Sequence, residues 1–309
     1  MGSVGVTNPL VSAARIARFT AVMYKPHYLL YGVLWVLALE GTASLVTQPD
    51  SAWRPTWSTM VRIVVVAFVL LYLRMVDEQK DLEYDRVHNP DRPLVTGAVS
   101  AVELRVAMGL IAIGAIAASL ALSVGSAVMI AVAMAYGLAL WGLERLFATV
   151  RTNILVNLVV TYPVQLLVTG YLVVSAIDTG EVRAHWQAAA VAGIFAGAFL
   201  QFEFARKTSR ERRPDELLYS NALGAKGSVA ASLVCAVAAV LCDVALVQPW
   251  EYSPPGSLIA RLPALVLAIP VSAAWTFLRG NRTDYPALPA VVFILALYLT
   301  LIGQALTLP

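Results

Sequence analysis

Five carboxylates lie within nine residues of this sequence, directly after a long apolar segment. The stretch "DEQKDLEYD" places them at Asp77, Glu78, Asp81, Glu83 and Asp85. Asp77, Asp81 and Asp85 are four residues apart, so on one continuous helix they share a face and repel one another. A divalent cation removes this repulsion, and a set of oxygen ligands is typical of Mg²⁺ bound to substrate phosphates.

The alternative interpretation of this stretch is a solvated helix end, which is what most runs of charge are. Two observations favour a functional site. Only Lys80 and Arg86 lie nearby to offset the acids. The acids also follow an apolar segment without a turn residue, which places them at a membrane boundary, where ionisable groups usually have a function.

The composition indicates a polytopic membrane protein. Of the 309 residues, 59% are hydrophobic and 13% are charged, whereas a soluble domain has about a quarter charged residues. The net charge is +3 and the basic residues lie between apolar segments, so we expect a lipid bilayer as a partner and no nucleic acid. The two cysteines, Cys235 and Cys242, share one apolar segment and predict neither a disulfide nor a metal site.

Nine segments are long and apolar enough to cross a bilayer as helices. They lie at roughly 28–46, 57–76, 104–122, 125–142, 154–175, 186–202, 226–247, 258–278 and 285–307. Only Ser123 and Val124 separate the third segment from the fourth, which predicts a tight helical hairpin. Pro163 falls inside the fifth segment and predicts a kink there.

The distribution of basic residues predicts the orientation in the membrane. If the N-terminus and the loops after the second, fourth, sixth and eighth segments share one side, that side holds eighteen of the 22 Lys and Arg residues. The other side holds Arg54, Arg62, Arg183 and Arg261. We therefore expect a cytoplasmic N-terminus, an outside C-terminus at Pro309, and a carboxylate stretch that faces the cytoplasm.

Two loops stand out because they are long and highly charged. They span 77–103 and 203–225, and four apolar segments separate them. This spacing puts one charged loop in each half of the chain. We expect a single membrane domain over 1–309, with two pseudo-repeated halves at about 15–150 and 151–309.

The first charged loop resembles a signature of the UbiA superfamily of intramembrane prenyltransferases. That signature is N-D-x-x-D-x-x-x-D, followed by R-P-L, a turn of small residues and a Ser. The stretch "DEQKDLEYDRVHNPDRPLVTGAVS" has Asp77 in the Asn place and Glu78 in the first Asp place, while Asp81 and Asp85 match. Arg92 begins the R-P-L match. The count of apolar segments also agrees with the family along the whole chain.

The resemblance implies an all-α bundle of nine transmembrane helices around a central cavity, with the active site on the cytoplasmic side. In the family, two Asp-rich motifs hold Mg²⁺ on the diphosphate of a polyprenyl donor whose tail lies among the helices. Loss of the diphosphate leaves an allylic cation that an acceptor captures. On this basis the expected metal ligands are Asp77, Glu78, Asp81 and Asp85, and Asp81 and Asp85 are expected to be catalytic. Lys80 and Arg92 are expected to contact the diphosphate.

The second charged loop departs from the family pattern, which is D-x-x-x-D. In "LQFEFARKTSRERRPDELLYSNALGAKGS", Glu203 takes the first acidic place and Lys207 takes the second. One possibility is that Glu203 binds metal while Arg206 and Lys207 act in catalysis by binding phosphate directly. The alternative is that "RKTSRERR" is only a positive-inside anchor.

Glu40, Asn153 and Asn157 have two interpretations each, and Tyr162 is one further candidate. Glu40 lies within the first apolar segment, where a charge is costly, so it is either paired inside the bundle or part of a cavity wall. Asn153 and Asn157 are either hydrogen-bonding contacts between helices or contacts to the prenyl tail or acceptor. Tyr162 precedes the kink at Pro163 and is a candidate for the same substrate contact.

Three functions remain open from the sequence. The first is a Mg²⁺-dependent prenyltransferase that moves a polyprenyl group from its diphosphate to an aromatic or other small lipophilic acceptor. The second is a terpene cyclase on the same scaffold, which needs no acceptor. The third is a non-catalytic membrane protein or a transporter, although the broken helices expected in matching positions of a transporter's two halves are not evident.

Overall fold

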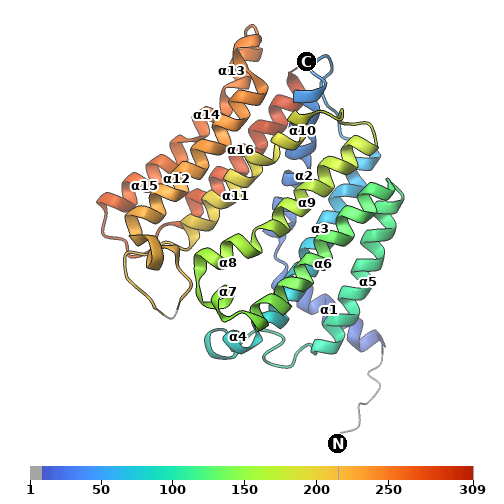
Figure 1. Cartoon of the computed structure of the whole chain (residues 1–309), viewed down its shortest axis with the longest axis vertical. Coiled ribbons are helices and arrows are strands. Elements are labelled where there is room, and N and C mark those ends of the chain that lie inside the picture. Colours follow the sequence, from blue (N-terminus) through green and yellow to red (C-terminus); the bar gives the residue numbers. More distant parts are fainter. Residues whose placement is uncertain (1–8, 215, 309) are drawn as a thin grey trace, which may run out of the picture.

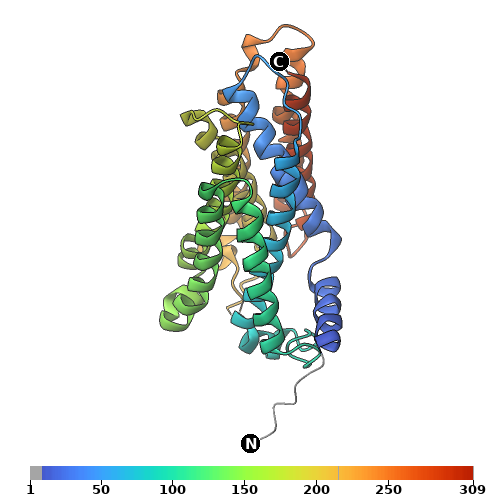
Figure 2. The same ribbon diagram turned by 90° about the vertical axis from the view of Figure 1, so that its right-hand side faces the viewer.

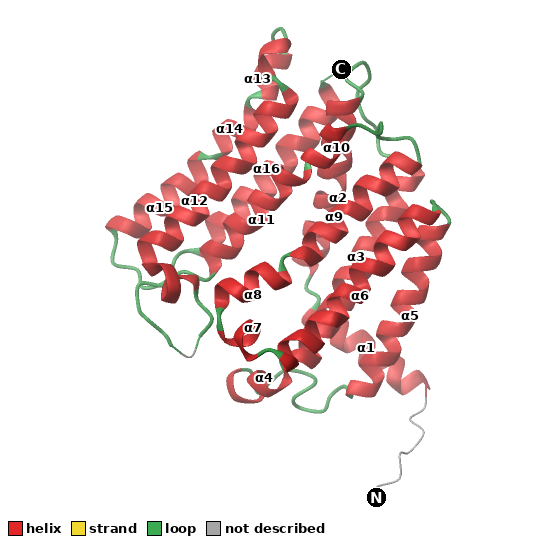
Figure 3. Ribbon diagram, in the orientation of Figure 1, coloured by secondary structure: helices red, strands yellow, loops and turns green. Residues whose placement is uncertain are grey.

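The computed structural model describes residues 9–214 and 216–308, and in this part of the chain helices are joined by loops (Figure 3). The first half contains α1 (Pro9–Met23), α2 (Pro26–Thr47), α3 (Trp57–Lys80), α4 (Leu82–His88), α5 (Ala101–Leu120), α6 (Val124–Leu146) and α7 (Ala148–Thr152). The second half contains α8 (Ile154–Thr161), α9 (Pro163–Asp178), α10 (Trp186–Ala190), α11 (Ala192–Arg206), α12 (Tyr219–Val247), the 3₁₀ helix η1 (Pro249–Glu251), α13 (Gly256–Ala260), α14 (Leu262–Val266), α15 (Ala268–Arg279) and α16 (Ala287–Thr307).

The nine predicted segments are confirmed as helices. Within the described residues, nine stretches are long and apolar enough to cross a membrane. The fifth consists of α8 and α9, which meet at Tyr162 directly before Pro163, so the predicted kink is confirmed. The hairpin between α5 and α6 is also as predicted, and the Ser123 side chain caps α6 by accepting a hydrogen bond from Ser126 N at 2.9 Å.

The outer faces of the helices are apolar and uncovered. On α5, the side chains of Val102, Val106, Leu110 and Ile113 are each 59–69% exposed. A continuous apolar surface of this kind is unfavourable in water and favourable against lipid tails. The chain is therefore an integral membrane protein.

The loops separate to the two ends of the bundle. In Figure 1, α1, α4 and α7 lie at the lower end, which we call the α4 end, and the C-terminus lies at the opposite end. The view in Figure 2 shows the same separation. The loop between α11 and α12 also lies on the lower side in Figure 1, so both charged loops are at the α4 end.

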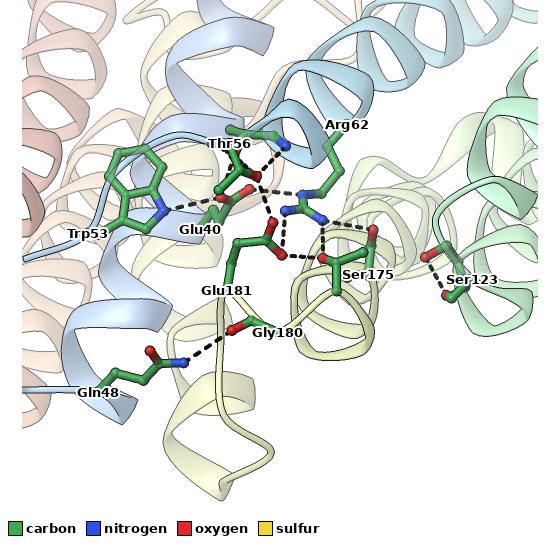
Figure 4. Close-up of polar contacts among 12 residues, drawn as sticks. Glu40, Gln48, Trp53, Thr56, Arg62, Ser123, Ser175, Gly180 and Glu181 are labelled. Carbon is green, nitrogen blue, oxygen red and sulfur yellow. Dashed lines mark hydrogen bonds and ion pairs between the residues drawn. The ribbon is translucent and has the colours of Figure 1, made fainter. Parts of the chain in front are cut away.

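A buried polar network joins α2, α3 and α9 near the opposite end (Figure 4). Its centre is Arg62, whose side chain is fully buried and pairs with Glu40 at 2.8 Å and with Glu181 at 3.1 Å. The Arg62 guanidinium also donates hydrogen bonds to Ser175 and Thr179. Glu40 is thus paired inside the bundle. Arg62, which the sequence assigned to a loop side, is an interior residue.

The crossing of α11 and α12 depends on a glycine. A Cβ atom at Gly197 would lie 2.7 Å from the Cys235 carbonyl oxygen and 2.9 Å from the Ala239 backbone nitrogen. Both are backbone atoms, so an added methyl group must separate the helices.

We expect Gly197→Ala to lower the free energy of unfolding in detergent by about 1–3 kcal/mol, which is typical of overpacking. Gly114→Ala is the matched control, because a Cβ at Gly114 has no neighbour within 4 Å. Equal stability of the two variants would contradict this packing description.

Candidate functional site

The carboxylate stretch does not form one continuous helix. α3 ends at Lys80, Asp81 has φ −91° and ψ 9°, and α4 begins at Leu82. The kink separates the three aspartates predicted to share a face: the side chains of Asp77 and Asp81 are 49% and 42% exposed, whereas that of Asp85 is 2% exposed. The prediction of a single acidic face is therefore wrong, because Asp85 turns into the protein toward Arg92.

Lys80 lies among three carboxylates at the end of α3. Its ammonium nitrogen is 3.1 Å from Glu144 Oε1, 3.5 Å from Asp77 Oδ1 and 3.9 Å from Asp81 Oδ1. Glu144 comes from the last turn of α6 and also accepts a hydrogen bond from Asn157 Nδ2 at 3.2 Å. The structure thus adds Glu144 to the site, and it connects Asn157 to the acids through that residue.

The other two acids are held by Arg92. Its Nη1 lies 2.9 Å from Glu78 Oε1 and 2.5 Å from Asp85 Oδ2. Glu78 pairs in addition with Arg74 at 2.8 Å, and Asn89 donates to Asp85 at 2.9 Å. Arg92 therefore ties the loop after α4 back onto the end of α3.

These ionic contacts form two neighbouring sets, one around Lys80 and one around Arg92. Together we call them the acidic cluster: Asp77, Glu78, Asp81, Asp85 and Glu144 with Arg74, Lys80 and Arg92. Five carboxylates face three cationic side chains, so negative charges outnumber positive charges by two, although each carboxylate has an ionic partner. The effect is visible at Asp81, where burial and the neighbouring acids Asp77 and Glu144 raise the pKa to about 6 although Lys80 opposes the shift.

In the second charged loop, positive charges outnumber negative charges around Glu203. Glu203, at the end of α11, is 8% exposed and pairs with Arg206 at 2.6 Å and with Lys207 at 2.8 Å. The Tyr219 hydroxyl donates a longer hydrogen bond to it at 3.4 Å. We call Arg206 and Lys207 the basic pair. One carboxylate between two cations leaves this group with one positive charge in excess.

Arg210 and Arg213 of this loop contact other partners. Arg210 donates to the backbone carbonyls of Arg282 and Gly280, at 3.0 and 2.8 Å. Arg213 pairs with Asp284 at 2.9 Å. These contacts fix the loop to the turn before α16, so Arg210 and Arg213 act as anchors and differ from the basic pair.

The acidic cluster and the basic pair lie within electrostatic range of each other. The pKa of Lys207 is lowered by burial and by the positive charges of Arg206 and Lys80, against the opposing effect of Glu203. Lys80 belongs to the acidic cluster, and both charged loops lie at the α4 end (Figure 1). Lys80 and Lys207 are thus near enough for their charges to interact, although more than 120 residues separate them in the sequence.

The interior residues named by the sequence separate into two groups. The Asn153 side chain caps α8 by accepting hydrogen bonds from Leu155 N and Val156 N, so it is used in the local fold. Tyr162 lies inside the bundle, where its hydroxyl is within electrostatic range of Tyr31 and Tyr298. The hydroxyls of Tyr31 and Tyr298 are 3.4 Å apart. These two tyrosines were not singled out from the sequence, where they are two of many aromatic residues in apolar segments.

The acidic cluster suits Mg²⁺ in charge and in ligand type. Asp77 and Asp81 are half-exposed oxygen donors, and the Lys80 ammonium already stands as a cation between them. In residues 9–214 and 216–308, no group of three or more His, Cys, Asp or Glu side chains is arranged so that it could hold a metal ion, so a metal at Asp77 and Asp81 would need these side chains to move away from Lys80. Glu203 does not suit a metal, because the basic pair and Tyr219 occupy both of its oxygens.

The comparisons with known proteins concern the fold. No protein-family model matches the chain, and no curated protein matches its sequence. Among solved structures, the apo structure of a UbiA homolog from Aeropyrum pernix K1 is similar with a TM-score of 0.61 and 18% identity, over 88% of this chain and 96% of that one.

Two further structures are similar over most of their length. A UbiA homolog from Archaeoglobus fulgidus bound to DMAPP and Mg²⁺ has a TM-score of 0.55 and 12% identity, over 92% of this chain and 98% of that one. A digeranylgeranylglyceryl phosphate synthase has a TM-score of 0.57 and 14% identity, over 91% of this chain and 99% of that one. The all-α bundle of this chain therefore has the fold of the UbiA homologs.

Proposed function

We propose that this protein is a Mg²⁺-dependent intramembrane prenyltransferase that moves a polyprenyl group from its diphosphate to an aromatic or other small lipophilic acceptor. The observation that carries the proposal is the convergence of the acidic cluster and the basic pair at one end of an apolar bundle. Such a site offers opposite charges to a metal and to a phosphate, directly beside an environment suited to an isoprenoid tail. The fold likeness to a structure bound to DMAPP and Mg²⁺ supports it.

The charge balance supports a metal at the acidic cluster. The excess of two negative charges in the cluster repels a diphosphate, so the acids need a divalent cation before the substrate can approach. Asp77 and Asp81 are the residues that would hold Mg²⁺, since they are half-exposed and their contacts with Lys80 are long, at 3.5 and 3.9 Å. Asp85 is buried against Arg92 at 2.5 Å. Glu78 is also buried, and Arg92 contacts only its Oε1. Bound Mg²⁺ would neutralise the diphosphate and stabilise it as a leaving group.

The chain's own cations complete the diphosphate site in this proposal. Lys80 and the basic pair present ammonium and guanidinium groups from two different loops. Fixed cations that face the leaving oxygens favour the state in which negative charge develops there. Arg92 contributes indirectly, because it holds Glu78 and Asp85 in place.

The bundle interior offers groups for the cation and the acceptor. The rings of Tyr31 and Tyr298 are 5.7 Å apart, and those of Phe195 and Tyr298 are 5.2 Å apart. Aromatic faces stabilise cations in a dry environment. The Tyr162 hydroxyl is buried and, within the described residues, has no hydrogen-bond partner, so it can contact a polar acceptor group. A buried hydroxyl that can bind a polar acceptor favours transfer of the prenyl group to an acceptor over cyclisation of the donor.

The proposed orientation follows the basic residues. The α4 end carries both charged loops, so it would face the cytoplasm with the N-terminus, and the C-terminus would lie outside. A water-soluble diphosphate group would then enter from the cytoplasm while its tail remains in the membrane.

The proposal is tested with the full chain purified in detergent. It is incubated with Mg²⁺ and geranyl, farnesyl or geranylgeranyl diphosphate, with and without an aromatic acid, and pyrophosphate and organic products are measured. We expect release only with acceptor, together with a prenylated product. Release without acceptor and a cyclic hydrocarbon would replace the transferase by a terpene cyclase. No release from any donor would overturn the proposal in both forms.

A further inference from the structure

We propose that the second charged loop binds the diphosphate directly through Arg206 and Lys207, with Glu203 as their positioning residue, so that metal is held by the acidic cluster alone. This inference rests on the proposed function, and it assigns the two charged loops different chemistry. The first charged loop would bind the diphosphate through a metal ion, and the second charged loop would bind it through side-chain cations.

The first support is that both carboxylate oxygens of Glu203 already contact donor groups. Arg206 contacts Glu203 Oε2 through Nε and Nη2, both at 2.6 Å, and Lys207 contacts Oε1 at 2.8 Å. Tyr219 donates to the same Oε1 at 3.4 Å. A metal ion at this carboxylate has to displace at least one of two cations that are attached to the same helix end. The carboxylate is instead suited to fixing the direction of both cations.

The second support is the absence of a partner acid. Lys207 stands four residues after Glu203, at the place where a second acid of the same helical face would lie. Among the described residues, the ionic partners of Glu203 are Arg206 and Lys207, and no other carboxylate pairs with that group. One carboxylate beside two cations repels a divalent ion and attracts a phosphate.

The third support is that the basic pair can reach a ligand. The side chains of Arg206 and Lys207 are 43% and 23% exposed while Glu203 is nearly buried beneath them. Each cation has donor groups beyond those used on Glu203, since a guanidinium has five N–H donors and an ammonium has three. Both charged loops lie at the α4 end (Figure 1), and Lys207 is near enough to Lys80 for the two charges to interact.

The experiment counts metal ions with Mn²⁺ as a spectroscopic substitute for Mg²⁺ and inorganic pyrophosphate as the ligand. Equilibrium dialysis of the full chain in detergent gives bound pyrophosphate, and electron paramagnetic resonance gives bound Mn²⁺. We expect one Mn²⁺ per bound pyrophosphate. Two Mn²⁺ per pyrophosphate would overturn the inference but leave the proposed function intact. No pyrophosphate binding by the wild-type chain would overturn both.

Three variants separate the roles. Glu203→Gln is expected to keep the Mn²⁺ affinity of the pyrophosphate-loaded chain within about twofold, because the residue is not a ligand. Lys207→Gln is expected to weaken pyrophosphate binding at least about tenfold, the usual loss for one charged hydrogen bond. Arg212→Gln is the matched control on the same loop and is expected to leave both affinities unchanged, since Arg212 is exposed and belongs to neither the basic pair nor the anchors.

The variants also define the contrary result. Loss of the bound Mn²⁺ in Glu203→Gln would make Glu203 a metal ligand and overturn the inference. Unchanged pyrophosphate affinity in both Lys207→Gln and Arg206→Gln would overturn it as well. Thermal unfolding of each variant in the same detergent shows that the compared chains are folded, and the Mn²⁺ count per bound pyrophosphate in the wild-type chain does not depend on any variant.

Discussion

Asp81→Asn is expected to reduce pyrophosphate release from a prenyl diphosphate by about 10²–10³-fold, the range found when one electrostatic contact to a leaving group is lost. The substitution keeps the shape of the side chain and removes one charge from the half-exposed acids nearest Lys80. The remaining cluster then attracts a divalent cation less strongly, and the diphosphate is less well neutralised. The measurement is initial-rate pyrophosphate release at saturating Mg²⁺.

Glu83→Gln is the matched control for Asp81. Glu83 lies two residues away in the same stretch, but its side chain is 85% exposed, and its ionic partner among the described residues is Arg86 at the surface. Release by this variant is expected to equal that of the wild-type chain. A release rate in Asp81→Asn within twofold of the control would remove Asp81 from the site.

Arg62→Met is expected to lower the free energy of unfolding by about 3–5 kcal/mol, the usual cost of removing one partner of a buried ion pair. Methionine fills much of the same volume, but the change leaves Glu40 and Glu181 buried without their shared cation. The measurement is denaturant unfolding in detergent. Arg183→Met is the control, because Arg183 lies near the same end and is exposed.

A double variant distinguishes charge from packing. Arg62→Met combined with Glu40→Gln removes one of the two stranded carboxylates, so it is expected to recover part of the lost stability. If Arg62→Met alone is as stable as Arg183→Met, the network in Figure 4 contributes little to the free energy of unfolding. Pyrophosphate release per folded molecule is expected to persist in Arg62→Met, because the network lies near the end opposite to α4.

The sequence was sufficient for the helices because membrane segments are defined by a strong local signal. Each segment must be apolar over about 20 residues and must satisfy its own backbone hydrogen bonds. The kink at Pro163 and the hairpin at Ser123 also follow from local rules, and both are confirmed. The partner of Glu40 was not predictable. Arg62 lies near the start of an apolar segment, where the sequence does not distinguish a buried arginine from a basic residue that flanks a loop.

Part of the candidate site was visible in the sequence, because charged residues beside an apolar segment are also a local signal. Acids at 77–85 and bases at 206–207 are visible as charge beside apolar segments, and the structure brings the two groups within electrostatic range. Glu144 was missed because it is a single acid at the end of an apolar segment. Its place in the site depends on its contact with Lys80, which the sequence does not show. The break at Asp81 was missed because no Gly or Pro precedes it, and the inward turn of Asp85 depends on Arg92 from a later part of the loop.

The most direct test of the proposed diphosphate site is a cryo-EM map of the full chain with Mg²⁺ and a non-hydrolysable farnesyl thiodiphosphate. The account predicts diphosphate density within hydrogen-bond distance, about 3 Å, of Lys207 and Arg206, with metal density beside Asp77 and Asp81 and the farnesyl chain among the helices. Diphosphate density at the opposite end of the bundle, or side chains of both charged loops directed into bulk solvent away from the ligand, would contradict it.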